Sequence, residues 1–206
     1  MGLNKVIVAS FKRGFEDKCS QLITESYVTA LETKVIQLNW DENDITSELH
    51  THINQNPLRL KWSIVTNVEQ HLSKNDAIKE KGFAAKLPRI DLRLVTINSD
   101  LEYEYHMEAK NLKETDSGLK RRYVDTGINN FISHKYENGC LLGYVIEGDL
   151  GKTVEGVNKL LKKDERDSEC LKAKPHNLHK FYYESEHSNS FILKHFMFDF
   201  TQLHSA

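Results

Sequence analysis

The feature that most constrains the fold is an alternation of apolar and polar residues in two neighbouring segments. Residues 101–110, LEYEYHMEAK, alternate without a break, and residues 89–97, RIDLRLVTI, do so around a set of aliphatic side chains. A period of two is typical of strands, and the turn-forming residues 98–100 between the segments predict an antiparallel hairpin. Such a hairpin brings the side chains of its two strands opposite each other.

Two acidic residues occupy strand positions in this hairpin, although acidic side chains there do not add to the stability of a sheet. Asp91 lies near the start of the first strand, on the face expected to be opposite Ile90 and Leu92. Glu108 lies near the end of the second strand, where pairing can bring it across from Asp91. Because paired carboxylates repel, we expect a cation between them. Mg²⁺ or Mn²⁺ suits a site of carboxylate oxygens, a backbone carbonyl and phosphate oxygens.

Two further groups complete the predicted metal site. The backbone carbonyl of Ala109 is expected as a third ligand beside Asp91 and Glu108. Lys110 shares a strand face with Glu108, so its ammonium is expected to lie near a metal-bound water. There it would orient the water for attack on a phosphodiester and stabilise the developing charge.

The sequence PRID at residues 88–91, followed by EAK at residues 108–110, resembles the PD-(D/E)xK motif of restriction-endonuclease-like nucleases. Two residues separate Pro88 from the acid, where the family motif has none. By this resemblance Asp91 and Glu108 are metal ligands and the lysine at 110 is catalytic. The resemblance implies a Mg²⁺-dependent endonuclease that acts on DNA rather than RNA, and we expect a role in bacterial defence or restriction in preference to DNA repair.

The elements around the motif are predicted in the order α-β-β-β-α-β, which is the order of the core of the resembled family. The predicted helices cover residues 41–55 and 118–136, and the predicted strands cover residues 58–70, 89–97, 101–110 and 140–148. The expected fold class is α/β (α+β), a restriction-endonuclease-like core with a central mixed sheet flanked by helices. We expect one domain over residues 1–206, with the core at about 41–148, an added amphipathic helix within 1–40 and a β-hairpin within 149–206.

The resembled family often adds an acid from the first helix, and Glu42 and Glu48 both qualify by position. With the aliphatic stripe that begins at Ile45 as the inward face, Glu42 falls about 20° from the centre of the stripe and Glu48 about 100° away. We therefore favour Glu42 as a fourth site residue. Acids also suit the first turn of any helix, so a purely structural role for Glu42 stays open.

Basic residues gather just after the motif and are expected to contact a phosphate backbone. They are Lys113, Lys120, Arg121 and Arg122. The formal net charge of the chain is −2, so any binding face is local. An ordinary solvated loop and helix face is the alternative interpretation.

The remaining patterns bear on compartment and partners. No apolar stretch approaches the roughly 20 residues of a membrane span, and the start of the chain lacks the apolar region of a signal peptide. The three cysteines form no CxxC pair, which suits a reducing compartment. We therefore expect a cytoplasmic protein with DNA as partner and no membrane contact, acting as a homodimer or within a larger defence complex.

Two other function classes stay open. One is a catalytically silent nuclease-like module that binds nucleic acid or protein in a larger complex, and the other is an RNA-cleaving toxin. His106 lies on the strand face of Glu108, while His187 and His195 lie in the expected C-terminal hairpin. Each of these histidines suits either packing or substrate contact.

Overall fold

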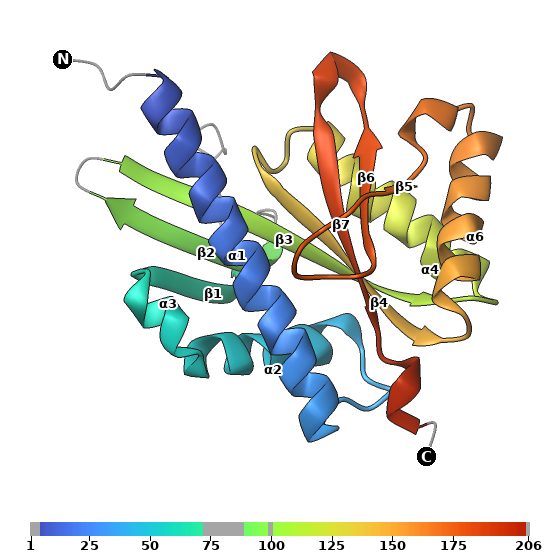
Figure 1. Cartoon of the computed structure of the whole chain (residues 1–206). Coiled ribbons are helices and arrows are strands. Elements are labelled where there is room, and N and C mark those ends of the chain that lie inside the picture. Colours follow the sequence, from blue (N-terminus) through green and yellow to red (C-terminus); the bar gives the residue numbers. More distant parts are fainter. Residues whose placement is uncertain (1–4, 72–88, 99–100, 205–206) are drawn as a thin grey trace, which may run out of the picture.

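The computed structural model describes residues 5–71, 89–98 and 101–204, which form a seven-stranded mixed sheet flanked by helices (Figure 1). The strand order is β1-β2-β3-β4-β7-β6-β5. The pairs β3/β4 and β4/β7 are parallel, and the other pairs are antiparallel. The predicted mixed α/β architecture is confirmed. Pro88 and two of the three predicted turn residues, 99–100, lie outside the described residues.

The strands are β1 (Ile64–His71), β2 (Arg89–Asn98), β3 (Leu101–Lys113), β4 (Gly139–Glu147), β5 (Lys172–Ala173), β6 (Tyr182–Glu186) and β7 (Ile192–Asp199). The α-helices are α1 (Lys5–Thr33), α2 (Glu42–Gln55), α3 (Pro57–Lys61), α4 (Ser117–Arg122), α5 (Asn129–Ile132) and α6 (Leu150–Lys163). A π-helix, η2 (Tyr123–Ile128), joins α4 to α5, and the short 3₁₀ turns are η3 (Asp167–Glu169), η4 (Ser188–Ser190) and η5 (Thr201–His204). Of the helices in the described ranges, none has the length and apolar character needed to span a bilayer.

Two hydrophobic clusters lie on opposite faces of the sheet. The first packs α1 and α2 against one face, and the second packs η2, α5 and α6 against the other. Strand β4 contributes to both, with Cys140 and Leu142 in the first cluster and Leu141 and Val145 in the second. Because β4 is covered on both faces, its sequence is continuously apolar rather than alternating, as predicted.

The segment before the hairpin differs from the prediction. Residues 58–61 belong to α3 rather than to a strand, which begins only at Ile64. Asn56 caps α3 by accepting a hydrogen bond from the backbone N–H of Leu58, and Pro57 occupies the first turn. An Asn-Pro pair of this kind favours a helix start, and this local signal outweighs the apolar run that follows it.

The face assignment within β2 also needs a correction. Ile90 packs in the second cluster, whereas Leu92 and Leu94 pack in the first. The alternation that would place all three on one face therefore breaks between Ile90 and Leu92. The last residue pair between β2 and β3 is Leu92 with Met107. The break in the alternation therefore coincides with the end of this strand pairing.

The accessory elements take the predicted form. Helix α1 buries an apolar stripe that includes Phe15, Leu22 and Ile23. Strands β6 and β7 form the expected C-terminal hairpin, and β7 joins the sheet beside β4. The two-residue strand β5 was not predicted, and it extends the sheet beyond β6.

Candidate active site

The candidate site lies along the edge of β3 that β2 leaves unpaired. Backbone groups at such an edge need other partners, and acidic side chains supply them here. The N–H of Ala109 donates to Asp91 Oδ2 at 2.7 Å. The N–H of Asn111 donates to Glu42 Oε2 at 3.3 Å. The end of one strand pairing thus brings together carboxylates from β2 and from the start of α2.

Lys110 is at the centre of this arrangement. Its Nζ lies 2.8 Å from Glu108 Oε1 and donates to the carbonyl oxygen of Ala109 at 2.6 Å. The same Nζ is 3.6 Å from Glu42 Oε1 and 3.8 Å from Asp91 Oδ2. The other four residues singled out as catalytic or metal-binding in the sequence therefore surround the ammonium of Lys110.

The cluster is shielded from solvent, which shifts its ionisation. The side chains of Lys110 and Glu108 are 6% and 7% exposed. Burial alone would lower the pKa of Lys110, but Glu108, followed by Asp91 and Glu42, outweighs burial and raises it. Burial and then the charge of Glu108 raise the pKa of Asp91 to about 6, because Lys110 offsets these effects only in part. The ammonium stays charged, and Asp91 becomes a weaker acid than usual.

Two residues that the sequence did not reveal hold Glu108. The hydroxyl of Tyr136 donates to Glu108 Oε2 at 2.6 Å, and Asn130 Nδ2 donates to Glu108 Oε1 at 3.3 Å. Burial, then the negative charge of Glu108, raises the pKa of Tyr136, so its proton stays in this bond. Tyr136 was placed at the end of a predicted helix, but it lies in the turn after α5, and no local pattern links it to a strand residue.

Glu42 is linked to the opposite helical layer. Arg122 Nη2 of α4 donates to Glu42 Oε1 at 2.6 Å, so an ion pair spans the open edge of β3. Glu48 lies elsewhere, 3.4 Å from His52 on the same helix. Of the two acids considered in this helix, the structure brings only Glu42 to the cluster. Glu42 also belongs to the first turn of α2, beside the N-cap Asp41.

The four residues predicted to bind nucleic acid lie in different surroundings. Arg122 lies beside the cluster, and Lys113 follows on β3, where its Nζ is 3.0 Å from Glu147 Oε2. The prediction for Lys120 is wrong. This residue is buried, and its Nζ donates to two carbonyl oxygens at the end of β3. Arg121 pairs with Asp164, beyond the end of α6, rather than pointing to the cluster. The first two therefore remain candidates for substrate contact.

The donor set of the cluster suits a hard divalent cation. Three carboxylates and the Ala109 carbonyl all point at one position, and such oxygens are the ligands that Mg²⁺ and Mn²⁺ prefer. As they stand, however, no three His, Cys, Asp or Glu side chains among the described residues form a metal-binding group. The ammonium of Lys110 lies between the carboxylates and balances their charge.

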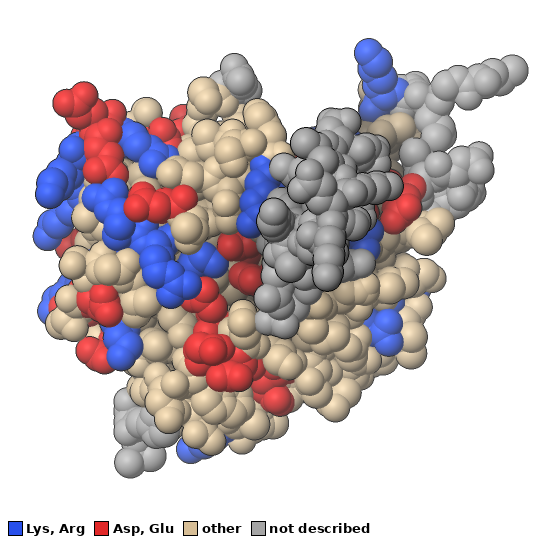
Figure 2. Space-filling model, turned by 180° about the vertical axis from the view of Figure 1, so that it is seen from behind, with Lys and Arg blue, Asp and Glu red and all other residues tan. Residues whose placement is uncertain are grey.

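Two hollows of similar size open at the surface of the described residues. The first, of about 490 Å³, is lined by residues that include Glu42, Asn111, Lys113 and Arg122. On the face of the molecule shown in Figure 2, Lys and Arg side chains gather over α4 and α6, next to a band of acidic side chains over α2. This hollow adjoins the carboxylate cluster through Glu42.

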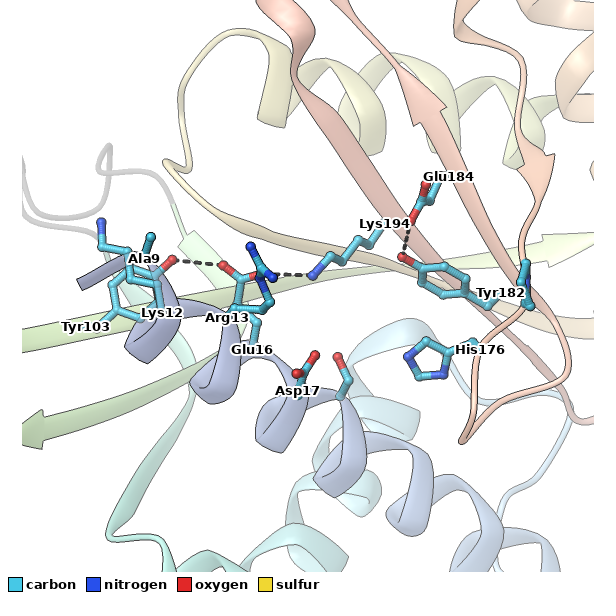
Figure 3. A pocket seen from close by; sticks show the side chains of 12 residues that line it. Ala9, Lys12, Arg13, Glu16, Asp17, Tyr103, His176, Tyr182, Glu184 and Lys194 are labelled. Carbon is cyan, nitrogen blue, oxygen red and sulfur yellow. Dashed lines mark hydrogen bonds and ion pairs between the residues drawn. The ribbon is translucent and has the colours of Figure 1, made fainter. Parts of the chain in front are cut away.

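The second hollow, of about 550 Å³, lies between α1 and the C-terminal hairpin (Figure 3). Two of its carboxylates are held by neighbouring side chains of the lining. Glu16 accepts a hydrogen bond from Tyr103 at 3.0 Å and from Lys194 at 2.8 Å, and Tyr182 donates to Glu184 at 2.8 Å. The cluster around Lys110 contributes no residue to this lining, so we do not regard the second hollow as part of the site.

The three histidines lie outside the cluster. His106 stacks on Tyr136 with ring centroids 5.5 Å apart, and burial lowers its pKa. His187 and His195 are buried and bond to Ser185 from either side. They therefore pack within the hairpin layer, and His106 reaches the cluster only through Tyr136.

Comparison with known proteins finds no matching family model, no similar curated protein and no similar solved structure. The chemistry of the site is therefore argued from its geometry.

Proposed function

We propose that this protein is a Mg²⁺-dependent (or Mn²⁺-dependent) endonuclease that hydrolyses phosphodiester bonds in DNA. The observation that carries the proposal is the convergence of Asp91, Glu108 and Glu42 on the ammonium of Lys110 at the open edge of β3. Repelling acids are costly to bury together, and four ionisable groups in one partly shielded cluster are typical of a functional site.

The topology around the cluster supports a restriction-endonuclease-like core. The described elements follow the order α2, β1, β2, β3, then α4 to α5, then β4. This is the α-β-β-β-α-β order of the resembled family, with the short helix α3 inserted. Strands β2 and β3 carry Asp91 and Glu108, as the resemblance implies.

In the proposed mechanism, Asp91, Glu108 and the Ala109 carbonyl would hold the ion, and Glu42 would add a fourth oxygen donor. The bound ion would polarise the phosphodiester and lower the pKa of a coordinated water. Lys110 would then leave its place between the carboxylates, and its ammonium would orient the attacking water and stabilise the charge that develops on the phosphate. Tyr136 and Asn130 keep Glu108 oriented, since partners behind a ligand fix its geometry.

One observation favours a second candidate, a catalytically silent module that binds nucleic acid. The ammonium of Lys110 already neutralises part of the acidic cluster, so the fold does not need an ion to relieve the repulsion. Such a module would keep the core and bind DNA without cutting it.

The deciding experiment incubates the purified protein with supercoiled plasmid in Mg²⁺, Mn²⁺ or EDTA, with tRNA and single-stranded DNA in parallel. The proposal predicts nicking or cutting of DNA that either metal supports and EDTA stops. DNA that is retarded in a gel but stays intact under every metal condition would favour the silent module. Cleavage of tRNA alone would replace DNA by RNA as the substrate.

Replacing Tyr136 by phenylalanine is expected to weaken Mn²⁺ binding by about 10-fold, because Glu108 loses the hydroxyl that orients it. The ring stays in place, so the loss of folding free energy should be only about 1–2 kcal/mol. Calorimetric titration with Mn²⁺ measures the affinity. Tyr182→Phe is the matched control, since its hydroxyl also donates to a carboxylate, Glu184, away from the cluster. Equal Mn²⁺ affinity in both variants would contradict this role of Tyr136.

A further inference from the structure

The hollow beside the carboxylate cluster is lined on one side by the start of α2 and the residues before it. Strand β3 and helix α4 form the other side. It encloses about 490 Å³, within the usual size range of small-molecule sites. Its lining residues are Leu38, Asn39, Trp40, Asp41, Glu42, Asn43, Asn111, Lys113, Leu119, Arg122 and Ile146.

Glu42 belongs both to this lining and to the cluster around Lys110, where its carboxylate is 3.6 Å from the ammonium. A group bound in the hollow would therefore lie next to the substrate of the cluster around Lys110.

Two cations on the wall are available to an anionic ligand. Arg122 has a side chain that is 53% exposed and uses Nη2 to bind Glu42. A guanidinium carries five N–H donors, so most of them remain for a further acceptor. Lys113 is one-third exposed and pairs with Glu147 at the rim. A phosphate group between these two cations would gain charge-assisted hydrogen bonds.

The wall also holds a polar group without a partner. Asn111 is 8% exposed, and its Nδ2 donates to the carbonyl oxygen of Trp40 at 3.0 Å. Its Oδ1 is shielded from solvent, and no described residue donates a hydrogen bond to it. An unsatisfied buried acceptor is costly, and a ligand O–H or N–H that reached Asn111 from the hollow would remove this cost.

We propose that this hollow binds one nucleotide of the strand that is cut, next to the scissile bond. Its phosphate lies between Lys113 and Arg122, and its sugar or base rests against Trp40 and Asn111. A nucleotide supplies an anionic group for the two cations, hydrogen-bond donors for Asn111 and a ring that can pack on the apolar lining residues Leu38, Trp40 and Leu119. This inference rests on the proposed nuclease function and names part of its substrate site.

The test uses deoxyadenosine monophosphate as the probe and tryptophan fluorescence as the readout. The chain has two tryptophans, so Trp62→Phe leaves Trp40 in the wall of the hollow as the sole reporter. In this background the nucleotide should change the fluorescence of Trp40 saturably. Adding Lys113→Ala should weaken binding by about fivefold or more, because a contact with a charged phosphate is lost.

Lys172→Ala is the matched control, since Lys172 also pairs with a glutamate on a neighbouring strand, at 3.3 Å, and lies on β5. It should leave the affinity unchanged. The inference is overturned if the nucleotide gives no saturable change, if Lys113→Ala and Lys172→Ala behave alike, or if inorganic phosphate binds as tightly as the nucleotide. Because this readout needs no cleavage, it can succeed or fail independently of the plasmid assay.

Discussion

Replacing Lys110 by methionine is expected to destabilise the metal-free protein by about 3 kcal/mol, because removing one partner of a buried ion pair leaves the other charge unpaired. Methionine keeps most of the packing volume but removes the charge that Glu108, Asp91 and Glu42 share. For a chain of this length the loss corresponds to a melting temperature lower by about 6–12 °C. Thermal unfolding in EDTA measures it.

Addition of Mg²⁺ should reverse much of this loss in the Lys110→Met variant. With the ammonium gone, a divalent ion can take its place among the same oxygens, and ligand binding to the folded state alone stabilises it. The stabilisation by Mg²⁺ should therefore be larger in the variant than in the wild type. Lys172→Met is the control, since its ion pair with Glu186 is half exposed and contributes little.

The same substitution should reduce DNA cleavage by at least about 100-fold, since a preorganised positive charge beside the reacting phosphate is lost. A folded, Mg²⁺-stabilised variant without activity would separate the role of Lys110 in chemistry from its role in stability. Cleavage at the wild-type rate, or a melting temperature that neither the substitution nor Mg²⁺ changes, would contradict the place given to Lys110.

Much of this arrangement was predictable because it depends on short-range periodicity. The alternation in residues 101–110 correctly predicted strand β3, and it correctly placed Glu108 and Lys110 on one face. The aliphatic stripe of α2, with Ile45, Leu49 and Ile53 fully buried, pointed to Glu42 rather than Glu48. Each of these inferences needs only the geometry of one element.

What could not be predicted depends on contacts between distant segments. The point where β2 stops pairing with β3 decides where the acids meet, and no local pattern marks it. Tyr136 reaches Glu108 from a turn 28 residues away in sequence. Lys120 is usually a surface residue type, but backbone carbonyls at the end of β3 bind its ammonium inside the fold. The prediction that Lys120 contacts a phosphate backbone used only its charge and was therefore wrong.

A second buried polar system, a chain of hydrogen bonds, has consequences for stability in acid. Tyr123 Oη lies 2.8 Å from His195 Nδ1, and His195 Nε2 lies 2.8 Å from Ser185 Oγ. Ser185 Oγ lies 2.6 Å from His187 Nε2, and His187 Nδ1 lies 2.6 Å from Glu169 Oε2. Every link is short enough for a good hydrogen bond.

The carboxylate at one end determines the direction of every bond in this chain. Ionised Glu169 only accepts, so His187 donates from Nδ1; burial lowers the pKa of His187, so its Nε2 carries no proton and accepts from the hydroxyl of Ser185. Ser185 in turn accepts from His195 Nε2, and Tyr123 donates to His195 Nδ1. Both histidines are neutral in this pattern, and a proton added to His195 Nδ1 would remove the acceptor for the Tyr123 hydroxyl and place a charge in the buried chain.

Acidification is therefore expected to destabilise the protein through His195. Burial, followed by the nearby His187, lowers the pKa of His195 to about 3 from the ordinary 6.5. A histidine with a depressed folded-state pKa contributes stability that is complete above pH 6.5 and is lost as pH falls toward 3. At about 1.4 kcal/mol per pH unit, the loss from this residue between about pH 7 and pH 4.5 is about 3 kcal/mol.

Urea unfolding at the two pH values measures this loss directly. His195→Gln removes the titrating group, while the amide of the new side chain can still donate to Ser185. The unfolding free energy of this variant should be lower than that of the wild type at neutral pH, because the imidazole contacts are lost. It should fall less on acidification, because no titrating group remains at this position. His134→Asn, at an exposed histidine whose positive φ asparagine tolerates, should keep the wild-type pH dependence. Only a group whose pKa differs between the folded and unfolded states makes stability depend on pH. If the His195→Gln variant loses as much unfolding free energy in acid as the wild type, the acid sensitivity therefore arises from another group.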